Sequence, residues 1–307
     1  MKIVYFSRED WEKDYVKGKL LEDDITFFSG PSQEYPTYED KDAEVISIFV
    51  KSHINKEELD KFPNIKFIAT RSTGFDHIDL EETEKRGIVV SNVPAYGANT
   101  VAEQAFALLT NLSRRVYESY ERVLEEGKFS PEGLRGFDLM GKTIGVVGTG
   151  KIGVNAIKIA HGFGMNIVAF DIKKNENLEK EFGVKYVEFD ELLAQSDIIS
   201  LHAPYNEHTH HMINMDNVEK IKNGAYLINT ARGGLVETKA LVHALEKGIL
   251  SGAGLDVLEE EGYMNDETEL ILDAHPNPES LRVLLANQYL IDHPGVLITP
   301  HNGFNTK

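Results

Sequence analysis

The chain has 307 residues, and its 32 Lys and Arg against 50 Asp and Glu give a formal net charge of −18. A length well past ~250 residues with 41% hydrophobic residues predicts a globular protein of two domains. The acidic balance argues against nucleic acid or an anionic membrane surface as a partner. The absence of cysteine excludes disulfides, zinc–thiolate sites and thiol nucleophiles, and we expect a cytoplasmic protein.

The chain contains no stretch of the ~18 uncharged apolar residues that a membrane-spanning helix needs. Residues 1–8 begin with one Lys and a short apolar run that charge interrupts at once. This start predicts a first β-strand rather than a signal peptide, and we expect no membrane association.

Short β-branched or aromatic runs alternate with helical patterns along the chain. The predicted strands, in chain order, are Ile3–Phe6, Val45–Val50, Ile65–Thr70, Ile88–Val90, Thr143–Gly148, Asn166–Phe170, Asp197–Leu201, Ala225–Asn229, Gly252–Val257 and Val296–Ile298. Predicted helices between them include Lys56–Phe62, Lys151–Phe163 and Glu237–Lys247. Continuous apolar runs are typical of strands covered on both faces. The alternation therefore predicts an α/β fold with two doubly wound parallel sheets.

One long helix separates the two series and is predicted to start near Thr100. Residues 100–103, Thr-Val-Ala-Glu, fit a capping box, in which the hydroxyl and the carboxylate satisfy amides of the first turn. Apolar residues from Val101 to Val116 then recur at helical spacing and form one stripe. The following segment, Glu125–Met140, is rich in glycine and is interpreted as a boundary.

A glycine-rich turn follows the strand predicted at 143–147. Its residues fit G-x-G-x-x-G and open a predicted helix, which is the context of a dinucleotide-binding turn. In that motif the first glycine allows the tight turn, the second admits a pyrophosphate, and the third permits close helix–sheet packing, while helix N-terminal amides bind phosphate. The predicted cofactor-binding residues here are Gly148, Thr149, Gly150, Lys151, Ile152 and Gly153.

The next predicted strand ends in Asp171, 18 residues beyond Gly153. A carboxylate at this position accepts hydrogen bonds from ribose hydroxyls and repels a 2′-phosphate. Asp171 therefore favours NAD over NADP, although Lys173 and Lys174 weaken the preference a little.

Three further turns follow predicted strands and carry Arg232, Glu261 and His301. An arginine can bind a carboxylate and polarise a carbonyl group, and a histidine can exchange a proton with the carbonyl oxygen. A carboxylate that holds the imidazole favours its charged form. An arginine, a histidine and a carboxylate together can therefore support hydride transfer to a carbonyl group.

At these residues the chain resembles the D-2-hydroxyacid dehydrogenase family, and within it the D-lactate dehydrogenase branch. The resemblance covers essentially the whole chain. The motifs that carry it are Arg71–Asp76, Asn92–Tyr96, Gly148–Gly153, Leu201–Pro204, Thr230–Gly234, Asp256–Glu261 and Pro300–His301.

The resemblance implies a role for each matching residue. Arg232 would bind the substrate carboxylate and carbonyl, His301 would be the general acid/base, and Glu261 would be its carboxylate partner. The implied substrate-binding residues are the Thr73 and Gly74 amides, with Tyr96, Phe304 and Phe49 lining a small side-chain pocket. Further implied cofactor-binding residues are His202, Pro204, Thr230, Ala231 and Asp256.

The resemblance also implies a domain organisation. Residues 1–97 plus 301–307 would form a flavodoxin-like substrate domain, and residues 98–300 a Rossmann NAD domain. A homodimer is expected through the long helix that begins at Thr100. In the family a C-terminal helix follows the catalytic histidine. The sequence stops six residues after His301, so we expect one bridging helix of about 10–14 residues to be lacking.

The predicted function is interconversion of pyruvate and NADH with D-lactate and NAD⁺. Glyoxylate or hydroxypyruvate reduction is the enzymatic alternative. An NAD-responsive interaction protein, similar to the C-terminal-binding-protein corepressors on the same scaffold, is an alternative of a different class. The lactate-type pair Tyr96 and Phe304 argues against that second alternative.

Two groups of polar residues receive the simpler interpretation. His208, His210 and His211 lie close together in sequence, but no cysteine or clear carboxylate set lies nearby, so we predict no metal site and interpret them as surface or capping residues. Glu259 and Glu260 are interpreted as solvated charges, and only the position of Glu261 sets it apart.

Overall fold

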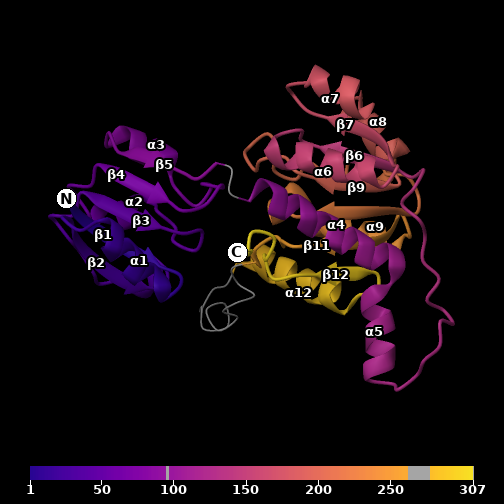
Figure 1. Ribbon diagram of the computed structural model, residues 1–307, viewed down its shortest axis with the longest axis horizontal. Helices are drawn as coiled ribbons and strands as arrows, with labels where there is room; N and C mark the ends of the chain where they lie inside the picture. The colour runs from indigo at the N-terminus through magenta and orange to yellow at the C-terminus, as the bar shows by residue number, and fades with distance from the viewer. Residues whose placement is uncertain (95–96, 262–276, 307) are drawn as a thin grey trace. The chain divides into compact units, whose positions relative to one another are not determined.

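The computed structural model describes residues 1–94, 97–261 and 277–306. The chain divides into two compact units, Met1–Tyr96 and Gly97–Lys307, each built on its own parallel sheet (Figure 1). The predicted fold class is therefore confirmed. The assignment of residues 301–307 to a substrate domain stays a prediction.

The first unit contains a five-stranded sheet of order β2-β1-β3-β4-β5, with every pair parallel. This is the flavodoxin-like strand order. The strands are β1 (Lys2–Ser7), β2 (Asp24–Ser29), β3 (Val45–Ile48), β4 (Phe67–Thr70) and β5 (Val89–Ser91). The edge strand β2 was not predicted, because it begins with a charged residue and its side chains are only half-buried beside a single neighbour.

Short helices cover this sheet: α1 (Trp11–Lys19), α2 (Lys56–Asp60) and α3 (Leu80–Lys85). The side chains of Asn55 and Asp79 accept hydrogen bonds from the first turns of α2 and α3, which fixes where these helices begin. Apolar strand residues such as Ile46 and Ile68 pack with Leu59 in a buried core.

The second unit contains a seven-stranded parallel sheet of order β12-β11-β10-β9-β6-β7-β8. Its strands are β6 (Thr143–Val147), β7 (Asn166–Phe170), β8 (Lys185–Tyr186), β9 (Ile198–Leu201), β10 (Ala225–Asn229), β11 (Leu250–Leu255) and β12 (Val296–Ile298). Counted from β6, this is the Rossmann order 3-2-1-4-5-6 with one more strand at the edge. The strand order reverses between β6 and β9, and ligands of such sheets bind outside the carboxyl ends at that point.

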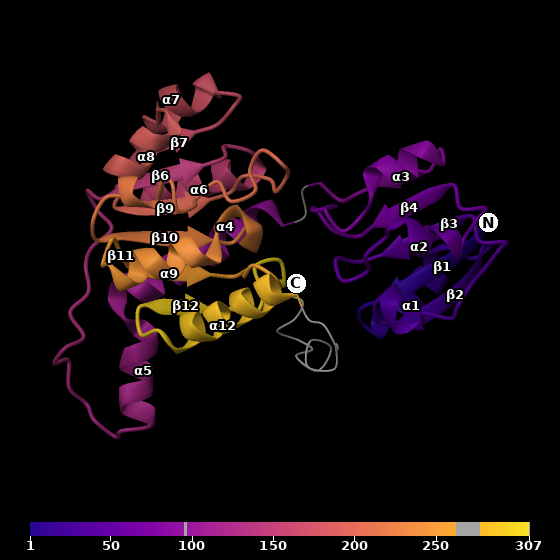
Figure 2. The same cartoon turned by 180° about the vertical axis from the view of Figure 1, so that it is seen from behind.

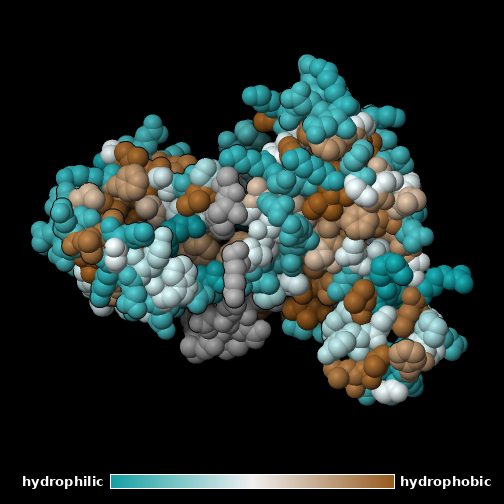
Figure 3. Space-filling view, in the orientation of Figure 1, coloured by the Kyte–Doolittle hydropathy of each residue, from teal (hydrophilic) through white to brown (hydrophobic). Residues whose placement is uncertain are grey.

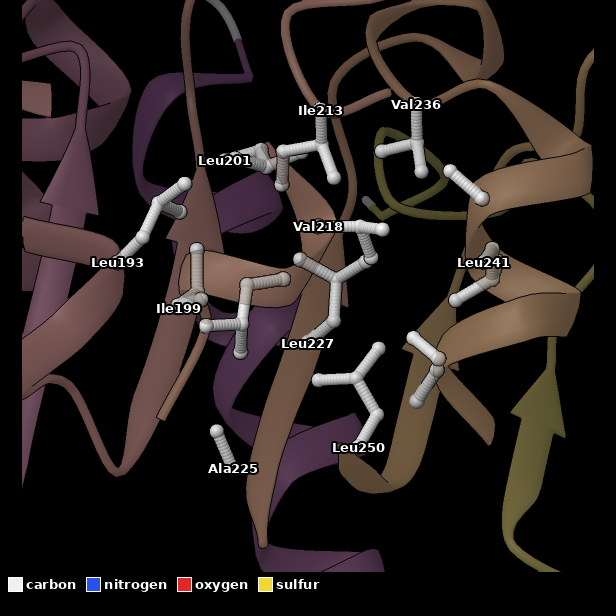
Figure 4. Close-up of a cluster of buried hydrophobic side chains, with 14 of the residues drawn as sticks. Leu193, Ile199, Leu201, Ile213, Val218, Ala225, Leu227, Val236, Leu241 and Leu250 are labelled. Atoms are coloured by element: carbon white, nitrogen blue, oxygen red, sulfur yellow. The ribbon is translucent and has the colours of Figure 1, made fainter. Parts of the chain in front are cut away.

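Helices cover both faces of this sheet. One face carries α4 (Ala98–Arg114), α6 (Lys151–Gly162) and α7 (Glu176–Phe182) (Figure 1). The other carries α8 (Phe189–Gln195), α9 (Thr238–Glu246) and α12 (Pro278–Asp292) (Figure 2). Leu193, Leu227 and Leu241 illustrate how α8 and α9 bury apolar side chains against the central strands (Figure 4). Each described helix is too short or too polar to cross a membrane.

The long helix corrects two expectations. It begins at Ala98, and its N-cap Gly97 makes no side-chain cap, so the predicted capping box at Thr100 is wrong. It also ends at Arg114, because Arg115 adopts a left-handed conformation with φ 52° and α5 (Val116–Leu124) starts in a new direction. Val116 is therefore half exposed rather than part of the buried stripe.

Candidate active site

The glycine turn between β6 and α6 has the shape of a phosphate cradle. Gly148 has φ +91°, and a Cβ atom there would lie 2.8 Å from the His202 backbone. A Cβ at Gly153 would lie 2.0 Å from the carbonyl oxygen of Gly148. A Cβ at Gly150 would meet no atom within 4 Å, and α6 begins at the next residue, Lys151. Gly150 therefore leaves open space in front of the helix N-terminus, where a pyrophosphate fits.

Asp171 follows β7 and is held by the glycine turn itself. Its Oδ2 accepts hydrogen bonds from the amide of Thr149 at 2.6 Å and from the Thr149 hydroxyl at 3.0 Å. The Tyr186 hydroxyl, which was not predicted to take part, donates to Thr149 Oγ1 at 3.0 Å. This chain of hydrogen bonds fixes the carboxylate at the place where a ribose is expected.

Two buried polar atoms after neighbouring strands of the NAD-binding sheet lack partners within the described residues. They are His202 Nδ1, after β9, and Thr230 Oγ1, after β10. The other ring nitrogen of His202 lies 2.9 Å from Ser200 Oγ, and burial lowers the pKa of this histidine to about 4, so it is neutral at pH 7. Unsatisfied buried polar atoms call for a partner, and a dinucleotide offers many. The residues present therefore fit such a cofactor. Of their predicted neighbours, Pro204 is exposed and Ala231 is half-buried.

His301 and Glu261 form a close pair. The Nδ1 atom of His301 lies 2.6 Å from Glu261 Oε1, and the second carboxylate oxygen accepts the amide of Leu258 at 3.2 Å. Both side chains remain partly exposed, by 29% and 41%. His301 Nε2 has no partner among the described residues and can therefore exchange a proton with a bound molecule. The ring of Phe304 stands edge-on to the imidazole at 6.1 Å between centroids.

Asp256 is a buried anchor for the turn that carries His301. Its carboxylate accepts hydrogen bonds from the amides of Asn302 at 2.9 Å and Gly303 at 2.7 Å, and from the hydroxyl of Thr299. His301 itself has φ 49°, a conformation that costs energy for a residue with a Cβ atom. The side chain of Asp256 is thus engaged inside the protein, and its predicted contact with the cofactor stays a prediction.

Arg232 lies on the turn after β10. The amide group of Asn229 holds this turn, because its Nδ2 donates to the Arg232 carbonyl at 2.9 Å and its Oδ1 accepts the amide of Ala231 at 3.1 Å. A Cβ at the next residue, Gly233, would lie 2.1 Å from the backbone of Leu258. The Arg232 turn therefore packs directly on the chain that leads to Glu261.

The predicted substrate-binding residues of the first unit also follow strands. Thr73 and Gly74 lie on the turn after β4, where their carbonyl groups accept hydrogen bonds from Asn92 and Ser72. The amides of Thr73 and Gly74 have no acceptor within the described part of the chain, so both can bind an anion. Phe49 follows β3. Tyr96 lies outside the described residues.

Comparison with known proteins agrees with this geometry. The family model for the NAD binding domain of D-isomer specific 2-hydroxyacid dehydrogenases matches residues 106–303. A 2-hydroxyacid dehydrogenase A of Aspergillus oryzae is 39% identical over 317 aligned positions, covering 100% of this chain and 87% of that protein. The chain belongs to the D-2-hydroxyacid dehydrogenase family. The protein is therefore an oxidoreductase, its cofactor is NAD, and its second unit contains the family's NAD-binding domain.

Relatives with different names match this dehydrogenase at similar identity. A glyoxylate reductase of Thermococcus litoralis is 42% identical and covers 74% of this chain and 70% of its own length. The crystal structure of a D-lactate dehydrogenase from Aquifex aeolicus, complexed with NAD and lactic acid, is 37% identical with a TM-score of 0.90. That alignment covers 99% of this chain and 90% of the other.

Two residues of the dehydrogenase were misjudged from sequence. Glu259, interpreted as a solvated charge, lies 2.5 Å from His211 Nε2 and accepts hydrogen bonds from the amide and hydroxyl of Thr238. His211 is accordingly hydrogen-bonded to a partly buried carboxylate, and 29% of its side chain remains exposed. The interpretation of Glu260 as exposed is confirmed. The described residues contain no group of three potential metal ligands.

Proposed function

We propose that this protein is a D-lactate dehydrogenase that interconverts pyruvate and NADH with D-lactate and NAD⁺. The observation that carries the proposal is the His301–Glu261 pair, on turns next to that of Arg232, at the edge of the NAD-binding sheet. A histidine whose Nδ1 is held by a carboxylate is oriented to exchange a proton through Nε2.

The mechanism follows from these groups. NAD, when bound, supplies hydride transfer at its nicotinamide ring. Arg232 would bind the carboxylate of the 2-oxo acid and polarise its carbonyl group, with the Thr73 and Gly74 amides as further carboxylate ligands. Protonated His301 would donate from Nε2 to the carbonyl oxygen, and Glu261 would stabilise the imidazolium that this step requires.

Pyruvate is proposed as the substrate because of Phe304. Its ring stands beside the imidazole of His301 and would restrict the space for the substrate side chain. The Aquifex aeolicus enzyme, a D-lactate dehydrogenase, supports this choice. The Thermococcus litoralis glyoxylate reductase supports glyoxylate or hydroxypyruvate as the competing substrate.

The decisive experiment measures NADH oxidation with a panel of 2-oxo acids and the chirality of the product. We expect the highest kcat/KM with pyruvate, and D-lactate as the product. A higher kcat/KM with glyoxylate or hydroxypyruvate would assign the enzyme to the reductases. NADH binding without turnover of any 2-oxo acid would favour the interaction-protein alternative, and an L-product would contradict the proposal.

The role of His301 is tested by His301→Gln. We expect kcat to fall by about 10²–10⁴, because the variant lacks the proton donor. The dissociation constant of NADH, measured by its fluorescence, should change little. Equal kcat in the variant and the parent would remove His301 from the mechanism.

We also propose a homodimer formed through α4 and α5. The exposed side of α5 carries apolar and aromatic side chains among charged ones (Figure 3), and five of these side chains are 50–64% accessible: Val116, Tyr117, Tyr120, Val123 and Leu124. Light scattering should give twice the chain mass, and Tyr120→Glu should shift it to the monomer. A parent protein that is monomeric at micromolar concentration would refute the proposed dimer.

We further propose that the protein is located in the cytoplasm.

A further inference from the structure

The pair formed by His211 and Glu259 connects two turns that carry candidate catalytic residues, the turn of Arg232 and the turn of Glu261. His211 Nε2 and Glu259 Oε1 are 2.5 Å apart, and the side chains are 29% and 15% exposed. The two residues are 48 positions apart in sequence and lie on different loops of the NAD-binding unit. Neither residue is among those expected to touch substrate or cofactor.

His211 is connected to the Arg232 turn through its backbone. Its amide donates a hydrogen bond to the carbonyl oxygen of Gly234 at 2.8 Å. His211 has φ 49°, an uncommon conformation for a residue with a side chain, and in it the amide binds Gly234 while the ring binds Glu259. A single residue thus links the Arg232 turn to the chain that carries Glu261.

Glu259 is fixed from several directions. Its Oε2 accepts the amide and the hydroxyl of Thr238 at 3.1 Å and 2.7 Å, at the start of α9. Its carbonyl oxygen accepts Asn287 Nδ2, a fully buried group on α12, at 2.8 Å. Burial opposes ionisation of Glu259, but the hydrogen bonds from Thr238 and His211 outweigh it and hold the pKa of this carboxyl below its ordinary value. The carboxylate is therefore charged at neutral pH.

The two turns also touch directly. A Cβ atom on Gly233 would lie 2.1 Å from the carbonyl group of Leu258 and 2.3 Å from the amide nitrogen of Glu259. Movement of residues 258–261 would therefore displace residues 232–234, and the reverse. His211 limits this movement, because its amide is bonded to the carbonyl oxygen of Gly234 and its ring is bonded to the carboxylate of Glu259.

We infer that His211 and Glu259 are positioning residues that keep Arg232 and Glu261 in the relative arrangement needed for hydride transfer. This inference rests on the proposed function, because it assigns Arg232 and Glu261 to the reaction. A displacement of about 1 Å between groups that bind the same substrate can lower a rate by about 10²-fold. A carboxylate that is hydrogen-bonded both to the imidazole of His211 and to Thr238 is a stiff connection between the turns.

The first test uses Glu259→Gln with Glu260→Gln as its matched control. Both changes remove one carboxylate from the same turn, but Glu260 is exposed. We expect kcat with the best 2-oxo acid to fall about 10- to 100-fold in Glu259→Gln and less than about twofold in Glu260→Gln. The dissociation constant of NADH should stay within about twofold in both. An unchanged kcat in Glu259→Gln would overturn the inference.

A second pair of variants separates positioning from a loss of folding. His211→Gln keeps a hydrogen-bond donor near the position of Nε2, whereas His211→Leu removes it. Assayed well below the melting temperature of each variant, Gln should retain most of the kcat that Leu loses. A primary isotope effect with NADH deuterated at the transferred position should rise in Leu, because hydride transfer becomes slower. Equal kcat and isotope effects in the two variants would contradict the positioning role.

Hydrogen exchange tests the connection independently of turnover. In Glu259→Gln, the amides of residues 256–261 and of residues 230–236 should exchange faster together, and in Glu260→Gln neither segment should change. Faster exchange confined to 256–261 would refute the connection even in an active enzyme. If the parent turned over no 2-oxo acid, the proposed function would fail, while this measurement would still decide whether the pair couples the two turns.

Discussion

Two groups of turns leave the same edge of the seven-stranded sheet, and they are held in different ways. The turn after β6 depends on close backbone packing that only glycine permits, because Cβ atoms at Gly148 or Gly153 would collide with backbone. The turns after β11 and β12 are held by the buried carboxylate of Asp256 and the partly buried carboxylate of Glu259, which accept hydrogen bonds from residues distant in sequence.

This difference shows where each turn is vulnerable. The glycine turn is defined by close contacts among neighbouring residues and the adjacent strand, so added volume should damage it most. The catalytic turns depend on partners 46 and 48 positions away in sequence, so the loss of one hydrogen-bonding group should damage them most. Four predictions test this contrast.

Gly153→Ala should have the largest effect. The added methyl group would lie 2.0 Å from the Gly148 carbonyl oxygen, and backbone cannot move aside at low cost. We expect a loss of about 3 kcal/mol or more in the free energy of unfolding, measured with urea, and at least ~10²-fold weaker NADH binding. Gly150→Ala is the control, because its methyl group meets no protein atom. It should weaken NADH binding with no change in unfolding, and equal melting temperatures for both variants would contradict the contrast.

His202 should make stability depend on pH. Its pKa is lowered to about 4 by burial, below the ~6.5 of an unfolded chain, so the unfolded protein takes up the proton first as the pH falls. The free energy of unfolding is therefore not reduced by His202 above pH 7, and it falls as the pH drops from 6.5 to 4. The ligand-free protein should lose roughly 2–3 kcal/mol more than His202→Asn between pH 7 and 4.5, measured with urea. His161→Asn, at an exposed position, should follow the parent. Parallel curves for parent and His202→Asn would refute the prediction.

Asp256→Asn should loosen the His301 turn. An amide group would place a donor near the amides of Asn302 and Gly303, which now donate to the carboxylate. We expect about 2 kcal/mol lower stability in chemical denaturation, with a lower kcat. Asp216→Asn, an exposed replacement of the same kind, should leave both unchanged. Full stability of Asp256→Asn would show that the turn does not depend on this carboxylate.

Tyr186→Phe should have the smallest effect. It removes the hydroxyl that donates to Thr149, which in turn donates to Asp171. A loss of about 1 kcal/mol in this network corresponds to roughly fivefold weaker NADH binding, measured by fluorescence titration. Tyr15→Phe, an exposed replacement in the first unit, is the control. Unchanged NADH affinity in Tyr186→Phe would show that Asp171 does not need this support.

The same contrast explains what the sequence could predict. The glycine turn and its strand and helix are contiguous, so residues 143–163 contain the whole signal. Buried strands such as β6 and β10 were predicted because apolar runs mark them, whereas the half-exposed β2 and the two-residue β8 carry too little pattern. The break at Arg115 escaped prediction because the left-handed conformation of a non-glycine residue has no sequence mark.

The pairing of His301 with Glu261 was predicted only through the resemblance to a family. Nothing in the spacing of the two residues requires it. Glu259 was misjudged for the same reason. Three consecutive glutamates look alike in sequence, and only the fold brings His211 and Thr238 to one of them.

The candidate site residues named above for the NAD-binding sheet follow the carboxyl ends of its strands, and none of them lies at the opposite, amino-terminal ends. There the chain turns from helix to strand at Gly183, after α7, and at Gly248, after α9, with open space beside both glycines. Peptide tags or whole domains inserted at such places would be remote from the reacting groups. Insertions at the amino-terminal ends of these strands should therefore disturb catalysis less than insertions at the carboxyl ends.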